Sequence, residues 1–253
     1  MKKYSYPEAQ SLVICGDIHG DFEALVYDAC VRYKLADTVV IVAGDCGFGF
    51  NRIKYYEALY NRLAGRLRKA NNWVVFIRGN HDAPAYFSEE RINYRRFRCI
   101  PDYSVVEAAG HNVLCVGGAT SIDRLDRIRL DEGSRKEECA HYWKDEAPVF
   151  SQELINSLDC RIDTVVTHTA PSFCYPNEKC SISSWLRRDP ELAADLDAER
   201  ETMDMLYRSL SGHPVQRWYY GHFHESKSEK IDGVHFRLLD CSEMAEVRMP
   251  AIV

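Results

Sequence analysis

The sequence lacks any apolar stretch that approaches the roughly 20 residues of a membrane-spanning helix. The basic residues near its start, Lys2 and Lys3, are followed by no apolar segment of the kind that a secretory signal contains. None of the ten cysteines forms a Cys-x-x-Cys pair, and several lie within apolar runs, as Cys15 and Cys115 do. These absences argue against a membrane protein, a disulfide scaffold and a structural zinc site. We therefore expect a cytoplasmic protein with no membrane partner and with free, mostly buried thiols.

The sequence also has no internal repeat, no low-complexity tract and no Gly/Ser-rich linker. Its 253 residues, 46% of them hydrophobic, fit a single domain over 1–253 with a substantial core. The net charge of -6 argues against stable binding of duplex nucleic acid, because affinity for the phosphate backbone needs a basic surface. A small anionic substrate stays compatible with this charge, since bound divalent cations can reverse the local field.

The first half of the chain alternates between strand and helix patterns. Short β-branched runs predict buried strands over 12–15, 38–43 and 73–77. The segments between them, 21–34 and 55–67, place apolar residues at helical spacing. Such alternation is typical of parallel strands joined by crossover helices, and it predicts an α/β fold.

The second half has a different pattern. Residues 105–106 and 113–116 predict an antiparallel pair joined through a turn at 110–112. Further short strands and one long helix are predicted at 164–167, 217–220, 235–239 and 189–210. Two segments, 123–146 and 172–188, fit neither pattern and are expected to be surface inserts that shape a pocket.

Residue types that bind metal ions recur directly after the predicted strands. The candidates are Asp17, His19, Asp45, Asn80, His168, His222 and His224. A carboxylate can bridge two cations, and imidazole and amide groups complete such coordination shells. Ligands of open α/β sheets bind outside the carboxyl ends of the strands. The pattern therefore predicts a two-metal hydrolytic site, a kind of site that mostly cleaves phosphoesters.

The order of these motifs resembles the calcineurin-like metallophosphoesterase superfamily. The motifs are Gly-Asp-x-His-Gly, Gly-Asp, Gly-Asn-His-Asp, Thr-His-x-Ala-Pro and Gly-His-x-His, and the match runs from residue 12 to about 240. Residues 44–48, 117–123 and 218–222 also resemble a bacterial and phage branch of single-domain phosphoesterases. The resemblance implies a four-layer α/β/β/α sandwich with the metal ions at one edge.

The resemblance also implies a role for each candidate. It gives the first metal ion to Asp17, His19 and His224. It gives the second to Asn80, His168 and His222, with Asp45 bridging the two. A hydroxide shared by both ions would attack phosphorus in line, and His81 would face the leaving group as proton donor or cationic clamp. Such oxygen and nitrogen ligands accept manganese, iron or zinc, so we expect two divalent ions of these kinds.

The sequence departs from one branch of the superfamily. Protein Ser/Thr phosphatases follow the bridging Asp with Asp-Arg-Gly, whereas residues 46–50 here are Cys-Gly-Phe-Gly-Phe. The group that orients His81 is therefore unidentified, and phosphoprotein phosphatase activity is disfavoured. Arg52 and Arg124, each shortly after a site loop, are the candidate substrate-binding residues.

We expect a phosphomonoesterase or phosphodiesterase that acts on a small phosphorylated substrate or a nucleotide. The alternatives are a nuclease or cyclic-nucleotide phosphodiesterase, since the same ligands serve both ester classes, and a non-catalytic metal-binding scaffold, which the complete ligand set disfavours. Trp143 and Trp185 are candidates for the lining of a substrate cleft. The arginines and aromatics of 91–98 suit either a nucleic-acid backbone or an edge strand.

Overall fold

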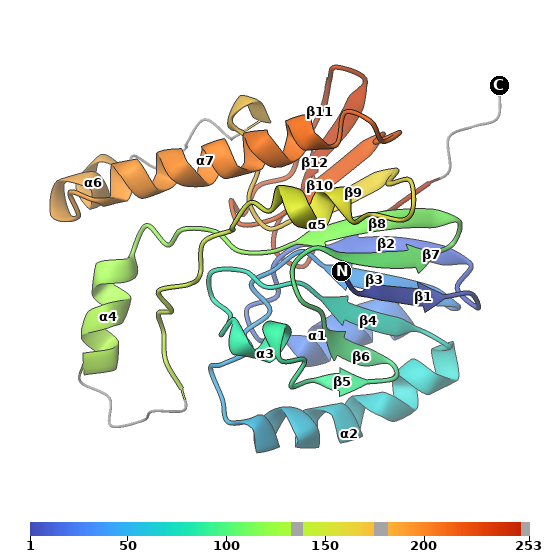
Figure 1. Ribbon diagram of the computed structural model, residues 1–253. Coiled ribbons are helices and arrows are strands. Elements are labelled where there is room, and N and C mark those ends of the chain that lie inside the picture. The colour runs from blue at the N-terminus through green and yellow to red at the C-terminus, as the bar shows by residue number, and fades with distance from the viewer. Residues whose placement is uncertain (133–138, 175–181, 249–253) are drawn as a thin grey trace.

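The computed structural model describes residues 1–132, 139–174 and 182–248, and it contains two β-sheets flanked by helices (Figure 1). The first sheet has six strands in the order β13-β2-β3-β4-β6-β5. Their bounds are Met244–Glu246, Ser11–Cys15, Thr38–Val42, Trp73–Phe76, Phe97–Cys99 and Asn93–Tyr94. The strands β2, β3, β4 and β6 are parallel, and the short edge strands β13 and β5 are antiparallel to their neighbours.

The second sheet has seven strands in the order β1-β7-β8-β9-β10-β12-β11. Their bounds are Lys3–Tyr6, Ser104–Ala108, His111–Val116, Thr164–Thr167, Arg217–Tyr220, Val234–Leu238 and Lys227–Ile231. β8, β9, β10 and β12 are parallel, whereas β7–β8 and β11–β12 are antiparallel pairs. In both sheets, therefore, the metal-ligand residue types follow the carboxyl ends of parallel strands.

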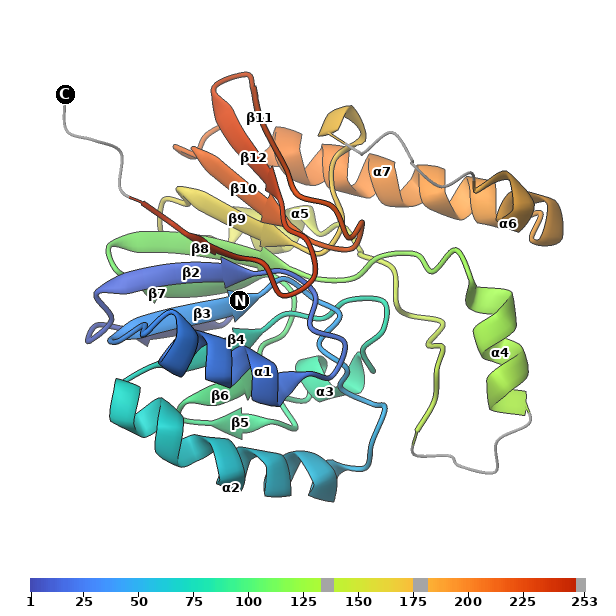
Figure 2. The same cartoon turned by 180° about the vertical axis from the view of Figure 1, so that it is seen from behind.

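Helices cover the outer face of each sheet (Figures 1 and 2). The helix α1 (Phe22–Tyr27), a π-helical turn η1 (Asp28–Arg32) and α2 (Ile53–Ala70) lie on the six-stranded sheet. The helix α7 (Leu192–Ser209) lies on the seven-stranded sheet. The remaining short helices are α3 (Ala85–Ser88), α4 (Arg124–Glu132), α5 (Gln152–Asn156), η2 (Ser172–Cys174) and α6 (Ser183–Arg188). Within the described ranges, no helix has both the length and the apolar character needed to cross a membrane.

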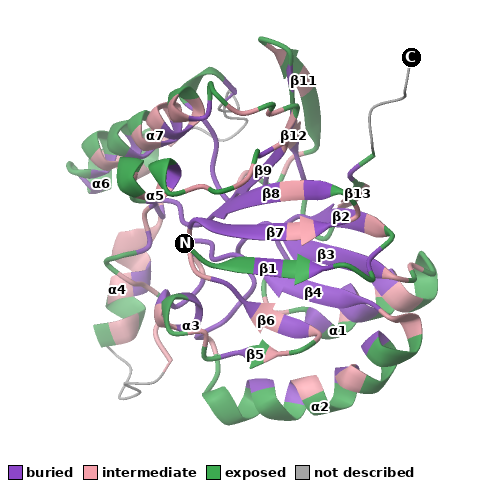
Figure 3. Cartoon of the chain, turned by 45° about the vertical axis from the view of Figure 1, so that its right-hand side comes forward, coloured by how far each residue is buried: buried purple, intermediate pink, exposed green. Residues whose placement is uncertain are grey.

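Side-chain alternation along the strands produces three layers of core. In β3, Val40 and Val42 face the helices, whereas Val39 and Ile41 face the other sheet. On the seven-stranded sheet, Trp218 packs toward α7 within the third layer. Figure 3 shows these central strands buried and much of the helical surface exposed. The predicted four-layer α/β/β/α sandwich is confirmed.

Several local predictions were wrong in detail. The helix expected over 189–210 begins only at Leu192. The helix expected over 21–34, by contrast, is confirmed, and it continues from α1 into the π-helical turn η1. The turn expected at 110–112 comes earlier, because His111 already pairs with Ala108 in the ladder. Figure 3 also places β1, which was not predicted, at the edge of its sheet.

The two expected inserts are only partly described. The charged segment 123–146 was expected to be a surface excursion, yet it begins with the helix α4, whose Arg127 is buried. Residues 133–138 and 175–181 of these inserts lie outside the described residues. Residues 91–98 form the edge strands β5 and β6, which agrees with the edge-strand interpretation.

The cysteines are less uniformly buried than expected. Cys15, Cys46, Cys99, Cys115 and Cys174 are buried, but Cys241 is exposed. The buried Cys46 follows Asp45 and donates its thiol hydrogen to the Ile77 carbonyl at 3.3 Å. Its thiol is thus part of the packing, as the sequence suggested.

Candidate metal centre

The seven metal-ligand candidates lie together where five strands end. Asp17 and His19 follow β2, Asp45 follows β3, Asn80 follows β4, His168 follows β9, and His222 and His224 follow β10. The two sheets thus contribute to one site, although these residues span more than 200 positions of the chain.

Two ligand groups share one carboxylate. Each group offers one ligand atom per residue, with all of these atoms within 4.8 Å of one another. The outer group consists of Asp17, His19, Asp45 and His224. The inner group consists of Asp45, His168 and His222, with the Asn80 amide oxygen 3.1 Å from His168 Nε2. Asp45 therefore stands between two clusters of ligand atoms.

The separations between ligand atoms fit divalent cations. His224 Nε2 lies 3.1 Å from Asp17 Oδ2, and His168 Nε2 lies 3.2 Å from Asp45 Oδ1. Two atoms that each bind a cation at about 2.0–2.2 Å are themselves about 3–4 Å apart. The donor set of carboxylate, imidazole and amide oxygen is also one that such cations accept.

Hydrogen bonding prepares His168 for this role. Its Nδ1 lies 2.7 Å from the Ala43 carbonyl oxygen and donates to it, which leaves Nε2 aimed at Asp45 and Asn80. Burial opposes a charge on this ring, but the Asp45 carboxylate outweighs it and raises the pKa of His168 to about 9. Burial likewise opposes ionisation of Asp45, yet the charge of His168 holds the pKa of that carboxyl well below its usual range. A bound cation would replace the proton that this pair shares.

The backbone is shaped around these carboxylates. A Cβ atom at Gly79 would lie 2.1 Å from Asp45 Oδ1, and one at Gly221 would lie 2.1 Å from Asp17 Oδ1. Four ligand candidates also adopt left-handed backbone conformations, with φ of 44° at His19, 47° at Asp45, 70° at His222 and 48° at His224. Such strain in non-glycine residues persists where the surrounding structure enforces it, and it clusters at functional sites.

Asp82 ties two site loops together. Its carboxylate accepts hydrogen bonds from the backbone N–H groups of Cys46, Gly47, Phe48 and Gly79, at 2.7–2.9 Å. Burial and the nearby Asp45 charge nevertheless raise the pKa of Asp82 to about 6. In the sequence this residue stood out only as the end of Gly-Asn-His-Asp, although its position directly after the catalytic candidate His81 was a signal for it.

A relay, meaning the hydrogen-bonded chain from Asn80 through Ser121 to Glu146, holds the Asn80 side chain of the inner group in place. The Asn80 Nδ2 donates to Ser121 Oγ at 2.9 Å, and Ser121 Oγ donates to Glu146 Oε2 at 2.6 Å. The Ser121 N–H donates to the other Glu146 oxygen at 2.7 Å. Because the amide NH₂ points to Ser121, its oxygen faces His168. Glu146 is buried, and burial raises its pKa to about 7.

Arg127 is the partner of His81 that sequence reasoning missed. Its Nη2 donates to His81 Nε2, and its Nε lies 2.8 Å from Asp123 Oδ1. His81 Nε2 lies 3.7 Å from Asp45 Oδ2, and burial with the neighbouring Arg127 lowers the pKa of His81 to about 4. Arg127 Nη1 is buried and has no hydrogen-bond partner among the described residues. The available signal was the pair Arg124 and Arg127, three residues apart, which a helix would place on neighbouring positions of one face.

A family model for calcineurin-like phosphoesterases matches residues 11–226. The chain belongs to this family. It is accordingly a metal-dependent phosphoester hydrolase, as the motif order implied.

A solved structure supports the fold of this phosphoesterase. The crystal structure of TT1561 of Thermus thermophilus superposes with a TM-score of 0.53 at 15% identity, over 94% of this chain and 98% of that one. A phosphopantetheinyl hydrolase from Mycobacterium tuberculosis matches with a TM-score of 0.41 at 14% identity, over 96% of this chain and 98% of that one. At such identities the likeness to the first structure shows the fold alone, and no argument rests on the second.

The two arginines chosen from the sequence lie in different surroundings. Arg124 is one turn before Arg127 on α4, and its guanidinium pairs with Asp189 at 2.5 Å and with Asp195. Arg52 lines a cavity of about 400 Å³ together with Trp143 and other residues. In the phosphoesterase, substrate contact by either arginine remains a prediction.

Cys241 is a further candidate that the sequence pattern did not indicate. Its sulfur completes a third group with His19 and His224 by the same 4.8 Å measure. Burial raises the pKa of this thiol to about 11, so the phosphoesterase keeps it protonated at neutral pH without a cation. It comes two residues after the predicted strand 235–239, as Asp17 comes after 12–15, so the spacing offered a signal that the motif order did not include.

Proposed function

We propose that this phosphoesterase hydrolyses small phosphomonoesters or phosphodiesters at a dinuclear centre. The observation that carries the proposal is Asp45, whose carboxylate belongs to both ligand groups. In this scheme Asp17, His19 and His224 hold one ion. Asn80, His168 and His222 hold the other, with Asp45 between them.

Two bound ions, manganese, iron or zinc, would supply Lewis acidity and an activated water for in-line attack on phosphorus. The protein's own side chains would position the ester. His81 and Arg127 lie side by side next to Asp45. Because Arg127 donates to Nε2 of a neutral His81, the guanidinium and the remaining ring N–H of His81 would present donors to the phosphoryl oxygens or the leaving group. The Nη1 of Arg127 is buried and has no partner within the described ranges, so it has hydrogen-bonding capacity that a phosphoryl oxygen would use.

A cavity lined by residues of two site loops supports a small substrate. Its walls include Gly49 and Ala83 from the two site loops, with Arg52, Arg91 and Trp143 around them. A volume of about 400 Å³ suits a small molecule. An aromatic ring and two guanidinium groups also suit a nucleotide, which favours a nuclease or cyclic-nucleotide phosphodiesterase activity as the second candidate function.

The test is an assay of the metal-free protein after manganese, iron or zinc is restored. The substrates are p-nitrophenyl phosphate and its bis ester, and a panel of cyclic and linear nucleotides decides between the two candidate functions. Replacing His81 by Ala should lower kcat by about 10³-fold, because a positioned hydrogen-bond donor is lost, while metal content stays at the wild-type value. No hydrolysis with any of these ions would refute the proposal, and unchanged turnover in H81A would remove the role of His81.

A further inference from the structure

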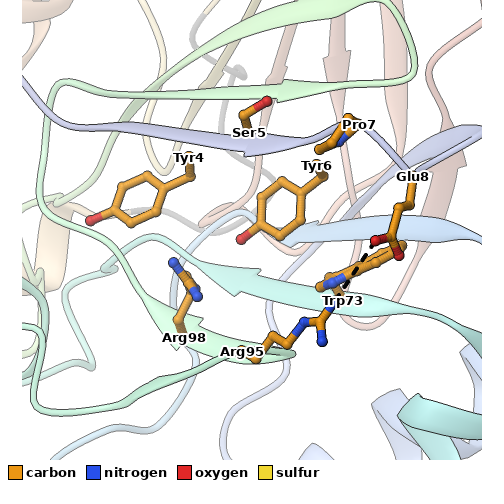
Figure 4. A pocket seen from close by; sticks show the side chains of 8 residues that line it. All are labelled: Tyr4, Ser5, Tyr6, Pro7, Glu8, Trp73, Arg95 and Arg98. Atoms are coloured by element: carbon orange, nitrogen blue, oxygen red, sulfur yellow. Dashed lines mark ion pairs between the residues drawn. The ribbon is translucent and has the colours of Figure 1, made fainter.

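A second pocket lies away from the ligand groups, between the edges of the two sheets (Figure 4). Tyr4 and Tyr6 come from the edge strand β1, and Trp73 and Arg98 come from β4 and β6 of the other sheet. Trp73 is the first residue of β4, whereas the ligand candidates follow the last residues of their strands. The pocket is therefore separate from the proposed hydrolytic site.

The pocket contains hydrogen-bond donors that no described residue accepts from. Tyr6 is 7% exposed, and its hydroxyl has no hydrogen-bond partner among the described residues. The Nε of Arg98 is likewise buried without a partner in the described part of the chain. Figure 4 shows the Tyr6 hydroxyl pointing toward the side chains of Arg98 and Arg95. A buried donor without an acceptor costs free energy, so the arrangement is suited to a ligand group that accepts hydrogen bonds from these donors.

The charge and shape of the pocket indicate which chemical class of ligand it would accept. Arg95 and Arg98 are cationic, and the one acid that lines the pocket, Glu8, reaches Arg95 only at 3.7 Å. Burial raises the pKa of Tyr6 to about 12, so its hydroxyl stays a donor at neutral pH. The cavity volume of about 170 Å³ is close to that of an engineered cavity that holds benzene, roughly 150 Å³. Aromatic walls from Tyr4, Tyr6 and Trp73 favour a flat group.

We propose that this pocket binds a small oxyanion, a carboxylate or phosphate group, with Tyr6, Arg98 and Arg95 as its donors. The anion would accept from the Tyr6 hydroxyl and the two guanidinium groups. Any ring that carries it would pack against the aromatic walls. The proposal does not depend on the hydrolytic activity.

Tyr4 provides a matched control on the same strand. Its hydroxyl already donates to Glu90 Oε1 at 2.6 Å, whereas that of Tyr6 has no such partner among the described residues. Replacing either tyrosine by Phe removes one hydroxyl and keeps the ring. Only Tyr6→Phe should therefore weaken anion binding.

The experiment follows the Trp73 indole resonance of the metal-loaded protein by NMR, during titration with benzoate, inorganic phosphate or benzamide. Benzoate or phosphate should shift this resonance with saturation, and which one binds more tightly tells whether the pocket takes carboxylates or phosphates. Tyr6→Phe and Arg95→Gln should each weaken that binding by about tenfold, because a hydrogen bond to a charged group is lost. Tyr4→Phe and the exposed Arg62→Gln should bind as the wild type does.

Three results would overturn the proposal. The first is the absence of a saturable shift with either anion. The second is equal binding of uncharged benzamide, and the third is unchanged anion affinity in Tyr6→Phe. Hydrolytic activity is measured on the same samples and should stay unchanged in all four variants.

Discussion

The two ligand groups share Asp45 but differ in how the protein surrounds them. In the inner group, His168 is fully buried, its Nδ1 is held by the Ala43 carbonyl, and Asn80 is held by Ser121. In the outer group, the side chains of His19 and His224 are 33% and 49% exposed. The comparison teaches that one proposed cation position is supported from behind by buried polar groups, while the other faces the solvent from which a substrate arrives.

The largest effect is expected from the residue that the two groups share. Replacing Asp45 by Asn removes a negative charge from both, so we expect loss of metal ions and a fall in kcat on the order of 10⁴-fold. Metal content by mass spectrometry and p-nitrophenyl phosphate hydrolysis check this. If D45N retained both ions, the groups would not be joined through this carboxylate.

Arg127, which contacts His81 beside the ligand groups, should affect the binding and turnover of substrate rather than the binding of metal ions. Arg127→Lys keeps the charge but loses the planar donor that contacts His81, so we expect kcat/KM to fall by about 10²-fold with metal content unchanged. Arg124→Lys, three residues away on the same helix, is the matched variant. A larger loss in Arg124→Lys would restore the sequence-based choice and remove the role proposed for Arg127.

The relay behind the inner group should affect metal affinity. Glu146→Gln weakens the hold on Ser121 and thereby on the Asn80 amide, so we expect affinity for one ion to fall by about 10–100-fold. Excess manganese should restore most of the turnover, which distinguishes a positioning residue from one that touches substrate. The exposed Glu153→Gln is the control. Equal metal affinity in both variants would show that the relay has no such role.

The smallest effect concerns the order in which ions leave. A chelator should remove one equivalent from the exposed outer group about tenfold faster than from the buried inner group. Stopped-flow release with a chromogenic chelator measures the two phases. His224→Ala should abolish the fast phase and His222→Ala the slow phase, and the reverse assignment would contradict the comparison.

Much of the fold could be predicted because its signals are local. The runs at 12–15, 38–43 and 73–77 are β-branched and continuous, and each became a strand buried on both faces. The helix α4 could not be predicted, since its residues are charged on nearly every face and few apolar positions mark a helical stripe. The edge strand β1 was missed for a similar reason, because four residues with a short alternation carry little signal.

The residues of the candidate site likewise differ in whether a local pattern could predict them. The metal-ligand candidates were visible as polar residues directly after predicted strands, a position that any sheet of this kind exposes to a ligand. Glu146 follows no strand pattern, and it reaches the site only because a distant segment folds back beside it. Cys241 does follow the predicted strand 235–239, but none of the motifs includes it. The choice between Arg124 and Arg127 depended on the rotational phase of a helix whose existence the pattern did not reveal.

The sequence by itself determined the buried central strands, the chemical types of the ligand candidates and the family to which the chain belongs. These depend on periodicity and on motif order, which are properties of neighbouring residues. Only the tertiary structure decided that Arg127 rather than Arg124 meets His81, and that the Tyr6 hydroxyl lacks a partner among the described residues. Such contacts join residues far apart in the chain, so packing between elements decides them and no local pattern records them.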